Sequence, residues 1–238
     1  MKHVVTVCGG GSGYTPGILL TALSYKDEFP IGEVRLYDID PIRNEDMRVI
    51  MEYLLKRDHH EDVKLVATGD PKTAFTGCDF IFSQIRAGGM KMREKDEKIP
   101  LSHGIVGQET CGLGGFSYGM RTMKAFTEMV GYIQEYAPDA WILNYTNPET
   151  IVAETVRRQF PNAKIINACD MTIGIEDLID HSFGYDRKNF IATYFGLNHF
   201  GWYTEIYDVT RGKDIMPEII DKIQHQGFKV DGLEPSWQ

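Results

Sequence analysis

The chain has 238 residues, of which 42% are hydrophobic and 25% are charged, and its formal net charge is −9 because 34 acidic side chains outnumber 25 basic ones. This is the composition of an ordinary globular protein, and it excludes a collagen-like, coiled-coil or disordered chain. The excess of negative charge makes nucleic acid and anionic membranes poor partners. No apolar run reaches the roughly 18 residues that cross a bilayer.

The first part of the chain alternates short β-branched runs with segments that repeat apolar residues at helical spacing. The runs predict strands over residues 4–8, 34–37, 63–67, 79–83, 141–144 and 164–167. The periodic segments predict helices over residues 16–25, 45–56, 70–75 and 149–158. Strands that alternate with helices of about ten residues are typical of βαβ units. The predicted fold class is therefore α/β, with a Rossmann-like, doubly wound and mostly parallel sheet.

The pattern changes beyond residue 189, where residues 190–194 and 202–209 are aromatic, alternating and strand-like. We expect a Rossmann-like domain over residues 1–189 and the beginning of an α+β substrate domain over residues 190–238. The last residues, 232–238, are polar and turn-like, with no closing helix. The second domain is therefore expected to be incomplete and to leave apolar sheet surface uncovered.

A glycine loop follows the first expected strand and opens the first expected helix. It consists of Gly9, Gly10, Gly11 and Ser12. Glycines let the backbone turn sharply and approach a pyrophosphate at a helix N-terminus, and Asp38 ends the second strand, where an acidic residue holds the ribose of a dinucleotide. The loop departs from the usual Gly-x-Gly-x-x-Gly because Tyr14 stands at the third glycine position. Dinucleotide binding is the favoured interpretation, and a tight turn without a ligand is the alternative.

Cys169 and Asp170 follow the last expected strand of the sheet, so they should lie at its carboxyl edge, where α/β folds bind ligands. A thiolate beside a carboxylate suits a transition metal. His199, in a Gly-Leu-Asn-His-Phe sequence, could complete a Cys/His pair. The alternative is a cysteine that acts as a small buried hydrophobe and a histidine with a structural role.

Three further segments carry polar or glycine-rich patterns. The amides of residues 144–148 could read sugar hydroxyls or a nicotinamide ribose, or could form an Asx turn before a helix. A local basic patch could take a phosphate or be a solvated face, and it comprises Arg86, Lys91, Arg93 and Lys95. Residues 107–115 are rich in glycine and predict a loop that lies close to a ligand.

Six motifs together resemble glycoside hydrolase family 4, and they occur in the order found in that family. The motifs are residues 9–12, 92–100, 107–112, 144–148, 169–171 and 196–201. The resemblance runs along essentially the whole chain and is strongest to the 6-phospho-α-glucosidase branch. Thr172 departs from the pattern, because the family usually has proline there.

The resemblance implies hydrolysis of 6-phospho-α-glucosides, such as maltose 6′-phosphate, with NAD and a divalent metal, usually Mn²⁺. In that chemistry NAD⁺ takes a hydride from C3 of the glucosyl ring, and a base then removes the acidified C2 proton. The glycosidic bond breaks by elimination before water and hydride are returned. The metal polarises the C2 and C3 oxygens as a Lewis acid.

The resemblance also assigns site residues. It implies Cys169 and His199 as the metal ligands and Asp170 as the general acid to the leaving oxygen. Branches of the family that cleave β-linked phosphosugars tend to carry Cys-Asn where this chain has Cys169-Asp170, so the resemblance favours α-linked substrates.

For the sugar and the cofactor, the resemblance implies Arg93 and Asn147 as phosphosugar ligands and Glu109 as the residue that tunes the basicity of the base. The implied NAD-binding residues are Gly9, Gly10, Gly11, Ser12 and Asp38. The family's base is a tyrosine well beyond the Gly-Leu-Asn-His motif, so neither Tyr203 nor Tyr207 is expected to serve. We therefore expect this chain to bind NAD, to bind metal weakly, and to hydrolyse slowly or not at all alone.

Two other classes of protein remain open. A lactate/malate dehydrogenase-like oxidoreductase would share the fold and the cofactor but would accumulate NADH. A non-catalytic remnant would bind a nucleotide or a phosphosugar without turnover. The expected partners are a phosphorylated disaccharide and further copies of the chain, as a dimer or tetramer. The cysteines form no Cys-x-x-Cys pair and no export signal is evident, so we expect reduced thiols and a cytoplasmic protein.

Overall fold

The computed structural model describes residues 2–228. By its contacts the chain divides into two compact units, of which the first ends at Ala168 and the second begins at Cys169. The expected boundary after residue 189 would instead assign residues 171–183 to the first unit. Where the functional domains divide stays a prediction. Within the described range, no helix is both long and apolar enough to cross a bilayer.

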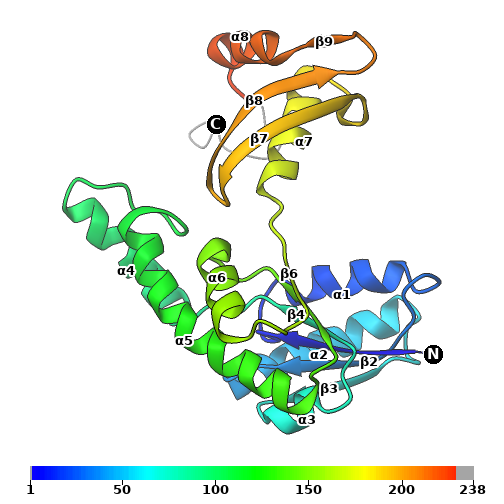
Figure 1. Cartoon of the computed structure of the whole chain (residues 1–238). Coiled ribbons are helices and arrows are strands. Elements are labelled where there is room, and N and C mark those ends of the chain that lie inside the picture. Colours follow the sequence, from blue (N-terminus) through cyan, green and yellow to red (C-terminus); the bar gives the residue numbers. More distant parts are fainter. Residues whose placement is uncertain (1, 229–238) are drawn as a thin grey trace. The chain divides into compact units, whose positions relative to one another are not determined.

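The first unit is built on a six-stranded parallel sheet with the spatial order β3-β2-β1-β4-β5-β6 (Figure 1). Its strands are β1 (His3–Cys8), β2 (Ile31–Tyr37), β3 (Lys64–Thr68), β4 (Phe80–Ser83), β5 (Trp141–Asn144) and β6 (Ile165–Asn167). Its helices are α1 (Thr15–Ser24), α2 (Pro41–Arg57), α3 (Pro71–Phe75), α4 (Gly89–Ser102), α5 (Gly112–Tyr136) and α6 (Glu149–Gln159). The predicted doubly wound α/β class is confirmed. The strand order reverses between β1 and β4, and this is the point at which such sheets bind ligands.

Apolar side chains fill both faces of this sheet. On one face, α1 and α2 bury residues such as Leu19 and Met51 against β1 and β2. On the other face, α3, α5 and α6 bury residues such as Phe75, Phe126 and Val156 against β4 and β5. Strands covered on both faces need apolar residues at almost every position, which is why the sequence shows them as short continuous runs.

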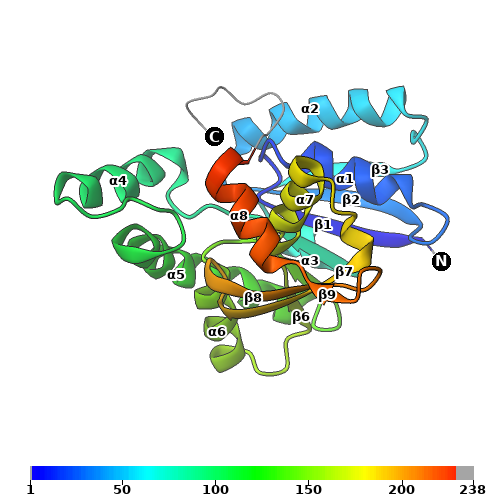
Figure 2. The same ribbon diagram turned by 90° about the horizontal axis from the view of Figure 1, so that it is seen from above.

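Helices α4 and α5 form a long hairpin that sequence periodicity did not predict. A helix of 25 residues is about 37 Å long, whereas a strand of four residues spans about 13 Å, so α5 extends past the sheet (Figures 1 and 2). The loop predicted over residues 107–115 is wrong beyond Cys111, because α5 begins at Gly112. A methyl group at Gly114 would lie 2.6 Å from the carbonyl oxygen of Asp96. Glycine is needed there so that α5 can approach α4.

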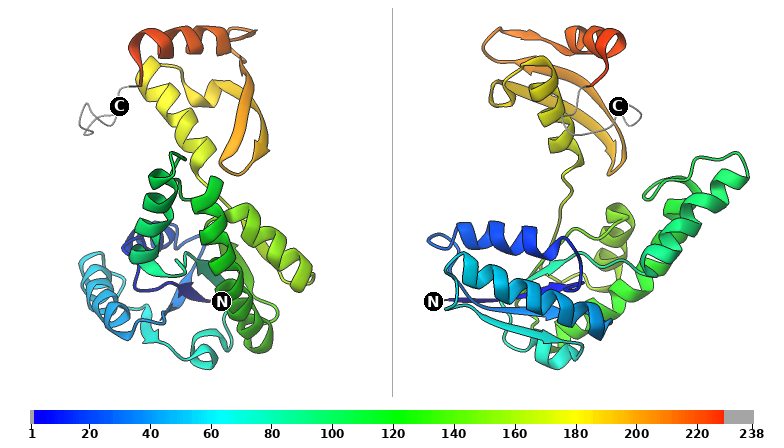
Figure 3. Two further views of the ribbon diagram at one scale, coloured as in Figure 1. Left: turned by 90° about the vertical axis from the view of Figure 1, so that its left-hand side faces the viewer. Right: turned by 180° about the vertical axis from the view of Figure 1, so that it is seen from behind.

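The second unit packs two helices, α7 (Met171–Phe183) and α8 (Met216–Gln226), on one face of a three-stranded antiparallel sheet (Figure 3). The order is β7 (Phe190–Leu197), β8 (Phe200–Asp208) and β9 (Lys213–Asp214), and a 3₁₀ turn, η1 (Arg187–Asn189), precedes β7. The opposite face leaves Phe195 and Trp202 about half exposed, so apolar sheet surface is uncovered, as expected. The turn-like ending predicted over residues 232–238 lies outside the described residues.

Candidate functional site

The glycine loop lies at the switch point of the sheet, between the carboxyl ends of β1 and β4. Gly9 has a φ of +80°, and a methyl group on it would lie 3.0 Å from the carbonyl oxygen of Gln84, which follows β4. At Gly10 an added methyl group would lie 2.7 Å from Cβ of Leu36 in β2. The loop therefore fits between two neighbouring segments only because it lacks side chains.

Asp38 follows β2 and holds this loop in place. Its Oδ2 accepts a hydrogen bond from the backbone N–H of Gly11 at 2.9 Å, and its Oδ1 accepts one from Asp40 at 2.9 Å. Ser12 donates its backbone N–H to the carbonyl of Gly9 at 3.0 Å. No side chain caps the N-terminus of α1 at Tyr14. The structure thus brings together a close backbone approach, an uncapped helix N-terminus and an acid, which are the features that fit a dinucleotide.

The turn after β5 shows that its two asparagines have different tasks. Oδ1 of Asn144 accepts the backbone N–H of Thr146 at 2.9 Å, which is an Asx turn, and its Nδ2 donates to Oδ1 of Asn167 at 2.9 Å. Oγ1 of Thr146 in turn accepts the backbone N–H of Ile85 at 3.1 Å. Asn144 and Thr146 are buried and structural, whereas Asn147 is only partly buried. Asn147 is therefore the more accessible amide of this turn.

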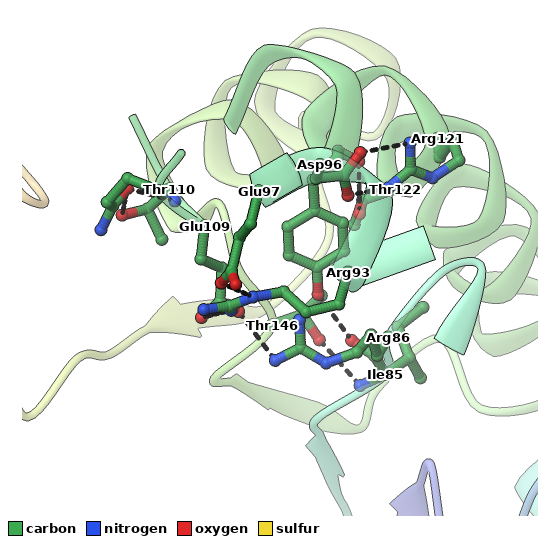
Figure 4. Close-up of polar contacts among 12 residues, drawn as sticks. Ile85, Arg86, Arg93, Asp96, Glu97, Glu109, Thr110, Arg121, Thr122 and Thr146 are labelled. Atoms are coloured by element: carbon green, nitrogen blue, oxygen red, sulfur yellow. Dashed lines mark hydrogen bonds and ion pairs between the residues drawn. The ribbon is translucent and has the colours of Figure 1, made fainter. Parts of the chain in front are cut away.

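Glu109, in the loop between α4 and α5, joins two arginines (Figure 4). Nη2 of Arg86 donates to Oε1 of Glu109 at 2.8 Å, and Arg93 pairs with the other oxygen of Glu109 and with Glu97. Burial raises the pKa of Glu109, but the charges and hydrogen bonds of the two arginines outweigh it and leave this pKa below its usual value. The other members of the predicted basic patch are exposed, namely Lys91 and Lys95.

A second ion pair joins α4 to α5 and was not predicted from the sequence. Arg121 of α5 pairs through two nitrogens with the buried carboxylate of Asp96 of α4 (Figure 4). Both arginine groups lie near the ring of Tyr118, whose centroid is 5.3 Å from the Arg86 guanidinium and 6.0 Å from that of Arg121. These partners lie on facing helices of the unpredicted hairpin. The only sequence signal was a set of charged residues close to a glycine-rich segment.

Cys169 and His199 come together within the second unit. Cys169 precedes α7, His199 lies between β7 and β8, and Sγ of Cys169 is 3.5 Å from Nε2 of His199. For Zn²⁺, bond lengths of about 2.3 Å to sulfur and 2.1 Å to nitrogen would place two donors of one tetrahedral ion about 3.6 Å apart. His199 also has a φ of +123°, an uncommon conformation for a residue with a side chain and one that is typical of functional sites.

These two donors fit a divalent transition metal, because a thiolate and an imidazole are its common protein ligands. Within residues 2–228, no group of three or more Cys, His, Asp or Glu residues could hold a metal ion. Any further ligand to a metal at this pair would be a residue of another type, a water molecule or a bound substrate.

Asp170 stands at the N-cap position of α7, yet its side chain makes no capping hydrogen bond and the residue is exposed. Aspartate is a common N-cap residue, but the carboxyl group of Asp170 does not serve as one. The hydroxyl of Tyr203 donates to the carbonyl of Thr172 at 2.9 Å. Burial, with the charge of Glu176, raises the pKa of Tyr203 to about 12. Its phenol would resist ionisation, which makes Tyr203 a poor base.

Comparison with known proteins identifies the family. The sequence profile described as "Family 4 glycosyl hydrolase" matches residues 4–184, and that of the "Family 4 glycosyl hydrolase C-terminal domain" matches residues 194–238. The chain is 48% identical to a 6-phospho-α-glucosidase of Leptotrichia buccalis over 99% of its length, and 44% identical to a maltose-6′-phosphate glucosidase of Bacillus subtilis over 98%. It covers 54% and 53% of these relatives.

A crystal structure supports the same assignment. A 6-phospho-α-glucosidase from gut microorganisms, solved in complex with NAD and Mn²⁺, has a TM-score of 0.91 to this chain and 40% sequence identity. The match covers 100% of this chain and 55% of that protein, so the chain spans about half the length of the relatives it matches. By profile, sequence and fold, the chain belongs to the family 4 glycosyl hydrolases.

Proposed function

We propose that this protein takes part in the NAD- and divalent-metal-dependent hydrolysis of 6-phospho-α-glucosides such as maltose 6′-phosphate. The observation that carries the proposal is the Cys169–His199 pair, whose donor atoms are 3.5 Å apart. Hydride transfer alone needs no such donor pair, whereas polarisation of sugar oxygens by a Lewis acid does. The names of the curated relatives give the substrate class.

Two groups of residues would hold the cofactor and the metal. The glycine loop and Asp38 would bind NAD, which supplies a hydride acceptor when bound. Cys169 and His199 would hold a divalent metal, Mn²⁺ by analogy with the gut enzyme, and this metal supplies Lewis-acid polarisation. The cysteine must be a thiolate to bind, so binding should need reducing conditions.

The remaining residues would act on the sugar. Arg93 would bind the phosphate through the guanidinium N–H groups that its ion pairs with Glu109 and Glu97 leave over. Asn147 would bind a sugar hydroxyl through its amide. Asp170 would donate a proton to the leaving oxygen, since its carboxyl group does not cap α7. That Glu109 tunes the basicity of the base stays a prediction. Its ion pairs with Arg86 and Arg93 support a role in positioning these two arginines.

A single assay distinguishes this proposal from the other two classes. The purified protein is incubated with p-nitrophenyl α-glucoside 6-phosphate, with and without NAD⁺, Mn²⁺ and a thiol reductant. Release of p-nitrophenol that needs NAD⁺ and Mn²⁺, with no net NADH, is the expected result, and its rate is expected to be low for this chain alone. NADH that accumulates in proportion to substrate would indicate a dehydrogenase. NAD⁺ binding without any turnover would indicate a binding protein. The expected homo-oligomer and cytoplasmic location stay predictions.

The course of the proposed reaction has its own isotopic test. Removal of the C2 proton by a base in D₂O would place deuterium at C2 of the released glucose 6-phosphate, which NMR detects. Product without deuterium at C2 would indicate direct displacement at the glycosidic carbon and would overturn the elimination course.

A further inference from the structure

We infer that Asp38 and Arg43 together decide whether this chain takes NAD or NADP, with Arg43 a cation suited to a 2′-phosphate that Asp38 keeps out. The inference rests on the proposed binding of a dinucleotide at the glycine loop. It concerns the end of β2, where this fold places the ribose of the adenosine half.

Arg43 occupies a position that the helix itself disfavours. Asp40 is the N-cap of α2 and accepts the backbone N–H groups of Ile42 and Arg43 at 3.1 Å each, so Arg43 is the third residue of the helix. Glutamate or glutamine is the preferred residue there, because it can complete a capping box. A cation in the first turn also meets the positive end of the helix dipole. Local helix stability therefore does not explain an arginine at this position.

The guanidinium of Arg43 instead turns toward the glycine loop. Its Nη2 donates to the carbonyl oxygen of Gly11 at 3.1 Å, although the residue as a whole is exposed. No carboxylate of the described residues forms an ion pair with Arg43. By contrast, Arg48, further along the same helix, pairs with Glu45 and Glu52. Arg43 is thus a cation with donors to spare beside the loop.

Asp38 places a negative charge on the same glycine. A methyl group added to Gly11 would lie 2.9 Å from Cβ of Arg43 and 3.1 Å from Oδ2 of Asp38, so these two side chains flank Gly11. The carboxylate accepts two backbone N–H groups and keeps further lone pairs, which suit ribose hydroxyls. Like charge makes the same carboxylate repel a phosphate.

Acidic and basic residues at this position have opposite effects on cofactor choice. An acid accepts the 2′-hydroxyl of NAD, whereas an arginine nearby accommodates the 2′-phosphate of NADP. This chain carries both, with the acid held rigidly by two hydrogen bonds and the arginine held by one. We therefore expect the chain to prefer NAD to NADP. The reason would be that the carboxylate of Asp38 repels the 2′-phosphate, and not that a cation for this phosphate is absent.

Calorimetric titration of the 238-residue chain with NAD⁺ and with NADP⁺ tests this. In Asp38→Asn, which keeps one acceptor oxygen, NADP⁺ affinity relative to NAD⁺ should rise at least about tenfold. Adding Arg43→Gln should remove that gain. Arg48→Gln, which deletes the same charge from the same helix, is the matched control and should change neither affinity. An unchanged cofactor ratio in Asp38→Asn, or a gain that survives Arg43→Gln, would overturn the inference.

Two further readouts keep the test decisive. Absence of NAD⁺ binding by the unaltered chain would overturn the proposed function itself, and the inference with it. Circular dichroism would show whether Asp38→Asn still folds. Should it unfold, Arg43→Gln alone is measured, and NADP⁺ affinity is expected to fall several-fold more than NAD⁺ affinity. Equal losses for both dinucleotides would overturn the role of Arg43 at the 2′-phosphate.

Discussion

Sγ of Cys169 lies 3.5 Å from Nε2 of His199, although 30 residues separate them along the chain. The backbone of the β7–β8 connection makes this possible. Gly196 has a φ of +122°, and a methyl group there would lie 2.5 Å from Cα of Gly201. The two strands can therefore approach closely at this end, and His199 donates its backbone N–H to Leu197 at 2.7 Å. A tight turn thus presents the imidazole to the cysteine.

Cys169→Ser should weaken Mn²⁺ binding by at least about tenfold, because a serine hydroxyl stays protonated at neutral pH and is a far poorer ligand than a thiolate. Titration of reduced protein with Mn²⁺, followed by the electron paramagnetic resonance signal of the free ion, measures this. Cys111→Ser is the control, since Cys111 is also only partly buried. Equal Mn²⁺ affinity in Cys169→Ser and the unaltered chain would contradict the ligand assignment.

Asp170→Asn should reduce turnover most with poor leaving groups, because an amide cannot donate an acidic proton to the departing oxygen. General acid catalysis contributes roughly 10²–10⁴-fold, so a loss of that order is expected with maltose 6′-phosphate. A much smaller loss is expected with the p-nitrophenyl substrate, whose leaving group needs no proton. Turnover of both substrates under identical NAD⁺ and Mn²⁺ concentrations is the measurement. Similar losses on the two would remove Asp170 from this role.

Gly10→Ala should weaken NAD⁺ binding and destabilise the first unit. The new methyl group would lie 2.7 Å from Cβ of Leu36 and 2.9 Å from Oδ1 of Asn44, so the loop must shift, at a cost of about 1–3 kcal/mol. Gly13→Ala is the matched control in the same loop, because no atom lies within 4 Å of a methyl group there. Thermal unfolding and NAD⁺ titration of both variants test this, and equal behaviour would contradict the packing argument.

Glu109→Gln should make the stability of the chain less dependent on pH in the acid range. The pKa of Glu109 is lowered in the folded chain, because the two arginines outweigh the effect of burial. Its ionised form therefore stabilises the folded state above the unfolded pKa of about 4.3, and this contribution disappears as the pH falls through the lower folded value.

Urea unfolding at pH 7 and at several values between pH 5 and pH 3 measures this effect. At pH 7, Glu109→Gln should cost about 1–2 kcal/mol, a value reduced for partial exposure to solvent. The difference between the two proteins should shrink as the pH falls from 5 toward 3. Glu28→Gln, an exposed carboxylate without an ion pair in the described residues, is the control. A constant difference between Glu109→Gln and the unaltered chain at every pH would argue against an ionised Glu109.

Sequence reasoning failed mainly at the α4–α5 hairpin, for a physical reason. The residues that α4 buries are Asp96 and Pro100, so this helix carries no apolar stripe that periodicity could detect. Glycine has a low helix propensity, so the glycines at the start of α5 predict a loop. Their helical conformation is stabilised instead by packing against α4. The ion pairs Arg86–Glu109 and Arg121–Asp96 were missed with it.

The sequence by itself determined the alternation of strands and helices in the first unit, the glycine loop that follows β1, and the motifs that point to family 4. These features depend on residues that are neighbours in the chain, so periodicity, turn chemistry and motif spacing record them. The sequence also predicted that Cys169 and His199 form a pair, but tertiary structure alone decided that their donor atoms lie 3.5 Å apart and that Asp38 and Arg43 flank Gly11. Such pairs form only when packing brings distant segments together, and a linear pattern does not carry those distances.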